Sequence, residues 1–184
     1  MTSTEPGSGG ARPRQAGITD LRRSPCFPRR PARKRLELVT ALLQSQSTLA
    51  LATSCADGSP RLAPLFYLPG ENLCLYWFSS PSSEHARNLK RDPAAAVAIY
   101  RSTDRWKQIC GVQMRGTVAV VTDRARRKSI AAPYAERFRL GALFTTAMSR
   151  SRLYEFQPSW LRYIDNSTRF GYKFELSLPL LSTV

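Results

Sequence analysis

The chain has 184 residues, of which 42% are hydrophobic, which is enough for one ordinary domain with a buried core. Its 28 Lys and Arg against 13 Asp and Glu give a formal net charge of +15, which favours anionic partners without defining a function. No run of about 18 apolar residues, no secretory signal and no Cys/His zinc spacing is present, so we expect a cytoplasmic protein with free thiols that does not cross a membrane.

The first 35 residues form a basic segment that we expect to be disordered. They contain five of the 13 prolines and show no apolar periodicity, so they cannot bury enough surface to offset the entropy of ordering. No recognised nucleic-acid-binding module accompanies the basic charge, and we do not expect nucleic acid as a partner. The sequence predicts one folded domain over residues 36–176 and a short C-terminal tail over residues 177–184.

The first part of this domain predicts a helix followed by strands. Apolar residues from Leu36 to Leu43 recur at helical spacing. Asp57-Gly58 is a strong hairpin signal, and a second turn lies over residues 69–72. The strands separated by these turns are predicted over residues 48–55, 61–68 and 73–79. We interpret the three strands as an antiparallel meander.

The remaining strands and helices complete a mainly β domain. A serine-capped helix is predicted before a buried strand, and Gly111 and Gly116 indicate bulge or bend points in the long strand that comes next. A basic helix is expected to be interrupted or bent at Pro133. The helices are predicted over 82–89 and 124–138 and the strands over 94–100, 109–122, 153–156 and 160–165, with the last strand ending near 174, while 140–149 is ambiguous. About six antiparallel strands with flanking helices predict a closed or half-closed barrel.

The residue types available for catalysis favour a bound cofactor over a catalytic side chain. His85 is the only histidine, and the chain contains no Gly-x-Ser-x-Gly elbow. The acidic residues are dispersed singly, and neither a phosphate-binding loop of the nucleotide hydrolases nor a dinucleotide fingerprint is present. Any redox or group-transfer chemistry would then be that of a cofactor that the protein holds in position.

A serine-rich turn lies between the predicted strand 73–79 and the helix that follows. Unpaired backbone N–H groups and the helix dipole favour an anion at such a junction. Hydroxyl groups, His85 and Arg87 would supply further donors to a phosphate, whereas the alternative is an ordinary capped helix with solvent-facing polar residues. The serines in question are Ser79, Ser80, Ser82 and Ser83. The residues alone leave both interpretations open.

Several motifs, in this order, resemble the pyridoxamine-phosphate-oxidase-like FMN-binding split-barrel superfamily. The first is Thr-Leu-Ala-Leu-Ala-Thr-x-x-x-Asp-Gly-x-Pro over residues 48–60, followed by a Leu-x-Leu-Tyr-x-x-x-Ser strand. The next is His-Ala-x-Asn-Leu-x-x-Asp-Pro-x-x-Ala-Val-Ala over residues 85–98. Trp106, residues 111–116, Tyr134-x-x-Arg-Phe and residues 164–173 are similar to short bacterial members of that superfamily. The match spans about residues 36–174.

The resemblance implies a Greek-key split β-barrel that forms a homodimer with FMN at the subunit interface. In such proteins the hydroxyl-rich turn and the basic residue at the His85 position hold the FMN phosphate, and one strand flanks the flavin ring through its backbone. The residues that it assigns to the cofactor are Leu62, Pro64, Leu65, Phe66, Ser79, Ser80, Ser83, His85 and Gln113. Trp106 and Trp160 are assigned either to the flavin pocket or, preferably, to the core of the barrel or dimer. An apolar face containing Leu73, Leu75 and Trp77 is expected at the dimer interface.

Two departures limit what the resemblance implies. The chain has Trp160-Leu161-Arg162-Tyr163 and lacks the C-terminal Arg-Leu-x-Pro/Asp-Arg signature with which pyridoxamine phosphate oxidases bind cofactor and substrate. Glu84 occupies a position where relatives often have Arg, which weakens phosphate binding electrostatically. We therefore predict an FMN-binding flavoprotein, an oxidoreductase acting on an unknown small-molecule substrate. The alternative is a non-catalytic protein on the same barrel that holds haem, a flavin-like ligand or nothing.

Overall fold

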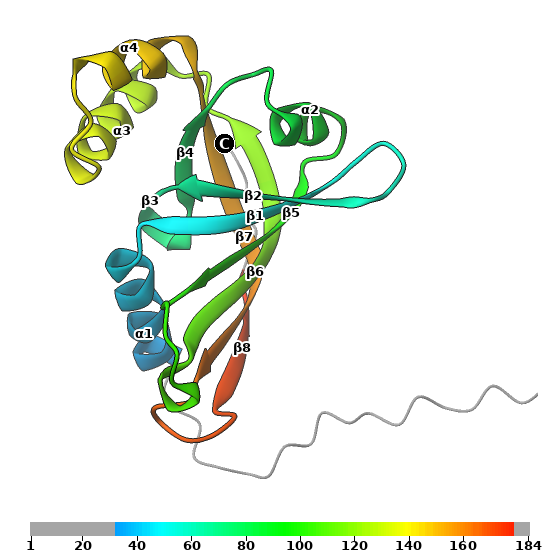
Figure 1. Cartoon of the computed structure of the whole chain (residues 1–184), viewed down its shortest axis with the longest axis vertical. Helices are drawn as coiled ribbons and strands as arrows, with labels where there is room; N and C mark the ends of the chain where they lie inside the picture. Colours follow the sequence, from blue (N-terminus) through cyan, green and yellow to red (C-terminus); the bar gives the residue numbers. More distant parts are fainter. Residues whose placement is uncertain (1–31, 179–184) are drawn as a thin grey trace, which may run out of the picture. The chain divides into compact units, whose positions relative to one another are not determined.

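A computed structural model describes residues 32–178 (Figure 1). The predicted disordered segment lies outside the described residues up to residue 31, as does the C-terminal tail from residue 179. The helix predicted from Leu36 begins earlier, at Ala32. No helix within residues 32–178 is both long and apolar enough to span a membrane.

The described residues form one antiparallel sheet. Its strands are β1 (Thr48–Ser54), β2 (Pro60–Phe66), β3 (Leu68–Pro69), β4 (Leu75–Ser79), β5 (Ala94–Tyr100), β6 (Cys110–Val120), β7 (Arg152–Asp165) and β8 (Lys173–Ser177). Their order across the sheet is β2-β1-β5-β6-β7-β4-β3, and β8 pairs with β7. The mainly β prediction is confirmed, with eight strands in this part of the chain where about six were expected.

The sheet curls into a barrel because its two ends are joined by a single residue. The strands β2 and β3 lie at opposite ends of the strand order, yet only Tyr67 separates them in sequence. The Tyr67 side chain is fully buried, and its hydroxyl donates a hydrogen bond to the Leu43 carbonyl oxygen at 2.6 Å. The predicted meander is therefore wrong, because β4 pairs with β3 and β7 and does not pair with β2. Turn signals locate the turns, but they do not specify which strands pair beyond a hairpin.

Within residues 32–178, four α-helices and two short 3₁₀ helices accompany the sheet. They are α1 (Ala32–Ser45), η1 (Glu71–Leu73), α2 (Glu84–Arg91), η2 (Trp106–Gln108), α3 (Arg124–Arg137) and α4 (Ala142–Arg150). The α3 helix continues through Pro133, so the interruption considered there does not occur. The ambiguous segment 140–149 falls largely within α4.

The bulge predicted at Gly116 is present and explains one error in the strand prediction. The register of β6 and β7 shifts between Arg115 and Gly116, where Gly116 lies opposite Pro158. A Cβ atom at Gly116 would lie 2.0 Å from the Gln157 carbonyl oxygen, so only glycine fits this close approach. The bulge accommodates Pro158, and β7 therefore continues as one strand where two had been predicted.

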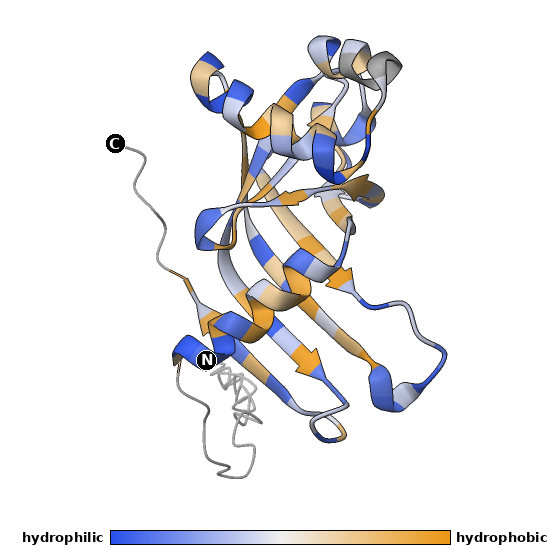
Figure 2. Cartoon of the chain, turned by 90° about the vertical axis from the view of Figure 1, so that its left-hand side faces the viewer, coloured by the Kyte–Doolittle hydropathy of each residue, from blue (hydrophilic) through white to orange (hydrophobic). Residues whose placement is uncertain are grey.

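The main core lies on the inner face of the curled sheet, beneath α1 and α2. Apolar and polar residues alternate along the strands, as expected when one face is buried (Figure 2). The largest fully buried side chains of this core are Trp77, Tyr67, Phe156, Leu42, Leu43 and Leu51. Leu73, Leu75 and Trp77 belong to it, so the expectation that they form a dimer interface is wrong. A smaller cluster beneath α3 includes Cys74, Tyr76, Ile130 and Leu153.

Candidate functional site

The serine-rich turn leads from β4 into α2, and Ser83 caps the helix. Ser83 has an extended backbone, and its hydroxyl oxygen accepts a hydrogen bond from the Ala86 N–H at 3.3 Å. A serine in this position satisfies one of the backbone donors that have no partner in the first helical turn. The remaining donors and the helix dipole favour negative charge near this end of α2.

His85 joins the two ends of the turn. Its Nε2 atom lies 2.8 Å from the Ser79 hydroxyl oxygen and 3.0 Å from the Ser83 hydroxyl oxygen. Burial lowers the pKa of His85, an effect that nearby Glu84 partly opposes, so the imidazole is neutral at pH 7. The structure therefore brings together three of the predicted phosphate ligands. The Ser80 hydroxyl does not join them and lies 2.7 Å from that of Ser82 in an exposed position, although the Ser80 carbonyl oxygen accepts a hydrogen bond from the Ser83 hydroxyl at 2.9 Å.

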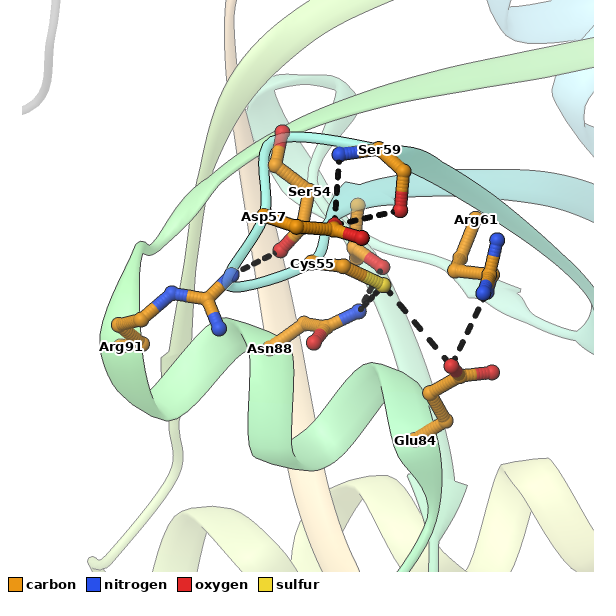
Figure 3. A network of polar contacts seen from close by, with 9 residues as sticks. Ser54, Cys55, Asp57, Ser59, Arg61, Glu84, Asn88 and Arg91 are labelled. Carbon is orange, nitrogen blue, oxygen red and sulfur yellow. Dashed lines mark hydrogen bonds and ion pairs between the residues drawn. The ribbon is translucent and has the colours of Figure 1, made fainter.

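Polar contacts fix α2 to the hairpin formed by β1 and β2 (Figure 3). The Asn88 side-chain amide donates to the Thr53 hydroxyl at 3.1 Å, and the Arg91 guanidinium donates to the Ser54 carbonyl oxygen. Near the start of the helix, Arg61 Nε lies 3.1 Å from a Glu84 carboxylate oxygen. Because Arg61 offsets the charge of Glu84, the acidic residue opposes an anion at this turn less than its sequence position suggests.

Sequence reasoning missed Arg152 as a further cation at the serine turn. Arg152 begins β7 directly opposite Ser79 at the end of β4, and such pairs have Cβ atoms about 5 Å apart on the same face. Its side chain is exposed and has no acidic partner within residues 32–178. No motif in the sequence indicates Arg152, because its position depends on the pairing of two strands more than 70 residues apart.

The strand predicted to flank the flavin ring is β2, at one end of the strand order. Leu62, Pro64 and Phe66 are exposed on its outer face, whereas Leu65 packs against the main core. The Leu62 side chain is 73% exposed. Among the described strands β2 pairs only with β1, which leaves backbone groups along its other edge without a strand partner. A planar ligand with polar edges could bond to such groups.

Gln113 does not join the other predicted cofactor residues within one chain. It lies exposed on the outer face of β6, opposite Ala98 of β5 and Arg162 of β7. Three strand spacings separate β6 from β2, about 14 Å along the sheet. The residues assigned to the cofactor therefore form two separate groups, one around β2 and the start of α2, and the other on β6.

The two tryptophans considered for the flavin pocket lie outside the core of the barrel. Trp106 is 54% exposed and forms an edge contact with Phe170 at 5.4 Å between ring centres. Trp160 is half-buried on the outer face of β7. The preference for the barrel core is therefore wrong for both residues, while the dimer core and the flavin pocket stay predictions. Within residues 32–178, no group of three or more His, Cys, Asp or Glu side chains could hold a metal ion.

Comparison of the chain with known protein families finds a match over most of its length. The family model described as pyridoxamine 5′-phosphate oxidase matches residues 36–165. No curated protein matches the sequence. Several solved structures share the fold at low sequence identity, so they bear on the fold alone.

Three of these structures illustrate the range of proteins built on the fold. A haem-binding protein from Mycobacterium smegmatis has a TM-score of 0.65 and 18% identity over 80% of this chain, which spans 59% of that protein. The haem storage protein HutZ from Vibrio cholerae has a TM-score of 0.57 and 16% identity, covering 76% of this chain and 92% of that one. A protein from Clostridium acetobutylicum related to general stress protein 26, of the pyridoxinephosphate oxidase family, has a TM-score of 0.59 and 16% identity, covering 78% and 94%.

Proposed function

Because the chain belongs to the pyridoxamine 5′-phosphate oxidase family, we propose that it is a flavoprotein that binds FMN and acts as an oxidoreductase on a small molecule. The observation that carries the proposal is the grouping of Ser79, Ser83 and His85 at the start of α2. This grouping suits a phosphate because it combines hydroxyl donors, an imidazole and the positive end of a helix dipole. When bound, FMN supplies the hydride or single-electron chemistry.

The protein's own residues would hold the phosphate by exchanging hydrogen bonds. In the described structure the Ser79 and Ser83 hydroxyls bond to His85, and these same groups can turn toward a phosphate oxygen. Arg152, opposite Ser79, would add a positive charge from the neighbouring strand. The unpartnered edge of β2 would hold the polar edge of the flavin ring through backbone groups. No residue of this chain is assigned a catalytic proton transfer.

We further propose that the site is completed by a second copy of the chain. Gln113 lies three strands from β2, so it does not reach a ring held at β2 of its own chain. The outer face of β6 on a partner subunit could reach it. A homodimer with FMN at the subunit interface accounts for both groups of assigned residues.

A haem-binding protein without catalytic activity is the second candidate. The likeness in fold to a haem-binding protein and a haem storage protein favours it. Two hydroxyls already bond to the Nε2 atom of His85, the only histidine available to coordinate haem iron in this chain. Coordination would break both hydrogen bonds, whereas a phosphate would accept hydrogen bonds from the same hydroxyls. This difference favours FMN.

An absorbance titration tests the proposal. We expect the purified full-length protein to bind FMN with perturbed flavin bands at about 370 and 450 nm, and to give no intense Soret band with haemin under the same conditions. Quenching of flavin fluorescence gives the stoichiometry, which we expect to be one FMN per chain. A Soret band that resists gel filtration, together with no FMN retained, would support the haem-binding candidate instead.

Light scattering tests the shared site. We expect the molar mass measured by light scattering at micromolar concentration to be twice the chain mass of 20.6 kDa, with or without FMN. Replacing Gln113 with alanine should weaken FMN binding without changing this mass, because the side chain would contact the ligand of the other subunit. A monomer that binds FMN with full affinity would contradict a site built from two chains.

A further inference from the structure

A second polar cluster lies on the outer face of the sheet, beside Gln113. Trp160 on β7 is contacted by two guanidinium groups, with the Arg115 carbon 4.4 Å and the Arg162 carbon 5.4 Å from the ring centre. Glu175 on β8 accepts hydrogen bonds from Arg162 Nε and a terminal nitrogen at 3.0 and 2.8 Å. The Trp160 indole N–H donates to the other Glu175 oxygen at 3.3 Å. Four side chains from three strands thus hold one another in place.

Within this cluster only Arg115 lacks an acidic partner. Glu175 forms its ion pair with Arg162 and accepts a hydrogen bond from the Trp160 ring, whereas Arg115 forms no ion pair with a carboxylate within residues 32–178. Arg115 is exposed and lies opposite Ala96 of β5, whose methyl group is too short to cover the guanidinium. The contact with the Trp160 ring restrains the guanidinium, and its N–H groups form no ion pair within residues 32–178. An arginine held in this way is prepared to bind a carboxylate or a phosphate.

The position of Arg115 relates the cluster to the flavin site. Arg115 and Gln113 are two residues apart on β6 and point from the same face, about 7 Å apart along the strand. If Gln113 approaches the flavin across a subunit interface, Arg115 reaches the same space. The phosphate of FMN would be held elsewhere, at the serine turn, so the anion left for Arg115 is one carried by the substrate.

We propose that Arg115, supported by Trp160, binds the carboxylate or phosphate of an anionic substrate in the flavin site. This inference rests on the proposed function, which supplies the flavin. It names the substrate class as a small molecule with one anionic group. The same cluster with a purely structural role would hold Trp160 against the sheet and would not distinguish an anion from a neutral molecule of the same shape.

Calorimetric titration of the FMN-saturated protein with three matched probes tests the proposal. The probes are benzoate, phenyl phosphate and the neutral benzamide. We expect at least one anion to bind at least about tenfold more tightly than benzamide. Arg115→Met should remove that preference by weakening the binding of the anion about tenfold to a hundredfold, the range for a charge-assisted hydrogen bond. Which anion binds more tightly separates a carboxylate from a phosphate. Met keeps an apolar stem over Trp160, so the sheet should remain intact.

Control measurements separate this proposal from the flavin assignment. Arg105→Met removes an exposed cation from the loop between β5 and β6, and we expect it to leave anion binding within twofold of the wild type. FMN affinity should also change less than twofold in Arg115→Met. Equal binding of all three probes, or an equal loss in both variants, would overturn the role of Arg115. If FMN does not bind at all, the same three probes are titrated into the protein without FMN. Anion binding that depends on Arg115 would then support the anion site, and a lack of such binding would contradict it.

Discussion

Replacing Ser83 and His85 together with alanine is expected to weaken FMN binding by about two orders of magnitude or more. Both side chains lie at the start of α2 within 3.0 Å of each other, where they would contact the phosphate. Hydrogen bonds to a charged group contribute about 1.5–3 kcal/mol each, and each 1.4 kcal/mol changes a dissociation constant about tenfold. Fluorescence titration of the wild type and of the variant with FMN measures the difference.

Riboflavin provides the control for this experiment, because it has the same ring and no phosphate. Loss of the Ser83 cap also costs helix stability, about 1 kcal/mol, so a fall in FMN affinity alone would not separate the two effects. We expect riboflavin affinity to change less than threefold in the double variant. Ser82→Ala, which removes an exposed hydroxyl from the same turn, should leave FMN affinity nearly unchanged. An equal loss for FMN and riboflavin would indicate damage to the helix and support the capped-helix interpretation.

The elements of this fold that depend on local signals could be predicted from the sequence. The hairpin at Asp57-Gly58 forms as expected, with Gly58 at a positive φ of 80° that glycine adopts without strain. Ser83 caps α2, and Gly116 marks the bulge in β6. Each of these features is set by a few neighbouring residues, so a single sequence contains the information that it requires.

The pairing of distant strands could not be predicted in the same way, and the site depends on it. Arg152 reaches Ser79, and Arg115 reaches Trp160, only because β7 pairs with β4 and β6 in one particular register. The ion pair between Arg61 and Glu84 likewise depends on the packing of α2 against the hairpin of β1 and β2. The continuity of β7 through Pro158 depends on the same pairing, because proline is expected at strand edges and the bulge that accommodates it is formed with the partner strand.

The attachment of α3 to the sheet illustrates a buried polar contact that sequence reasoning missed. Glu155 lies in β7 with its side chain only 6% exposed, and its carboxylate is 2.6 Å from the Arg126 guanidinium on α3. The Tyr76 hydroxyl donates to the same carboxylate at 2.9 Å. Burial raises the pKa of Tyr76 to about 12, so the hydroxyl keeps its proton at pH 7. Glu155 thus depends on Arg126 and Tyr76, with the Cys74 thiol as a weaker third partner, to compensate for its loss of hydration.

Replacing Arg126 with methionine is therefore expected to lower the free energy of unfolding by about 2–3 kcal/mol. The carboxylate would remain buried with only the tyrosine hydroxyl and the weakly donating Cys74 thiol beside it, and removing one partner of a buried pair typically costs about 3–5 kcal/mol. We expect the lower value because Arg126 is itself 44% exposed, and solvent can reach the carboxylate once the guanidinium is gone. Urea unfolding at pH 7 measures the change. Arg124→Met, on the same helix and without an acidic partner among the described residues, should cost less than about 0.5 kcal/mol.

A double variant distinguishes the cost of an unpaired charge from the loss of packing. If the destabilisation comes from the carboxylate left behind, Arg126→Met combined with Glu155→Leu should restore most of the lost stability, because a buried ion pair can be replaced by apolar side chains at little cost. If it comes from the contact between the Arg126 guanidinium and the Tyr76 ring, 5.8 Å from its centre, the double variant should be no more stable than the single one. We expect recovery to within about 1 kcal/mol of the wild type, because the double variant leaves neither member of the ion pair behind as an unpaired buried charge.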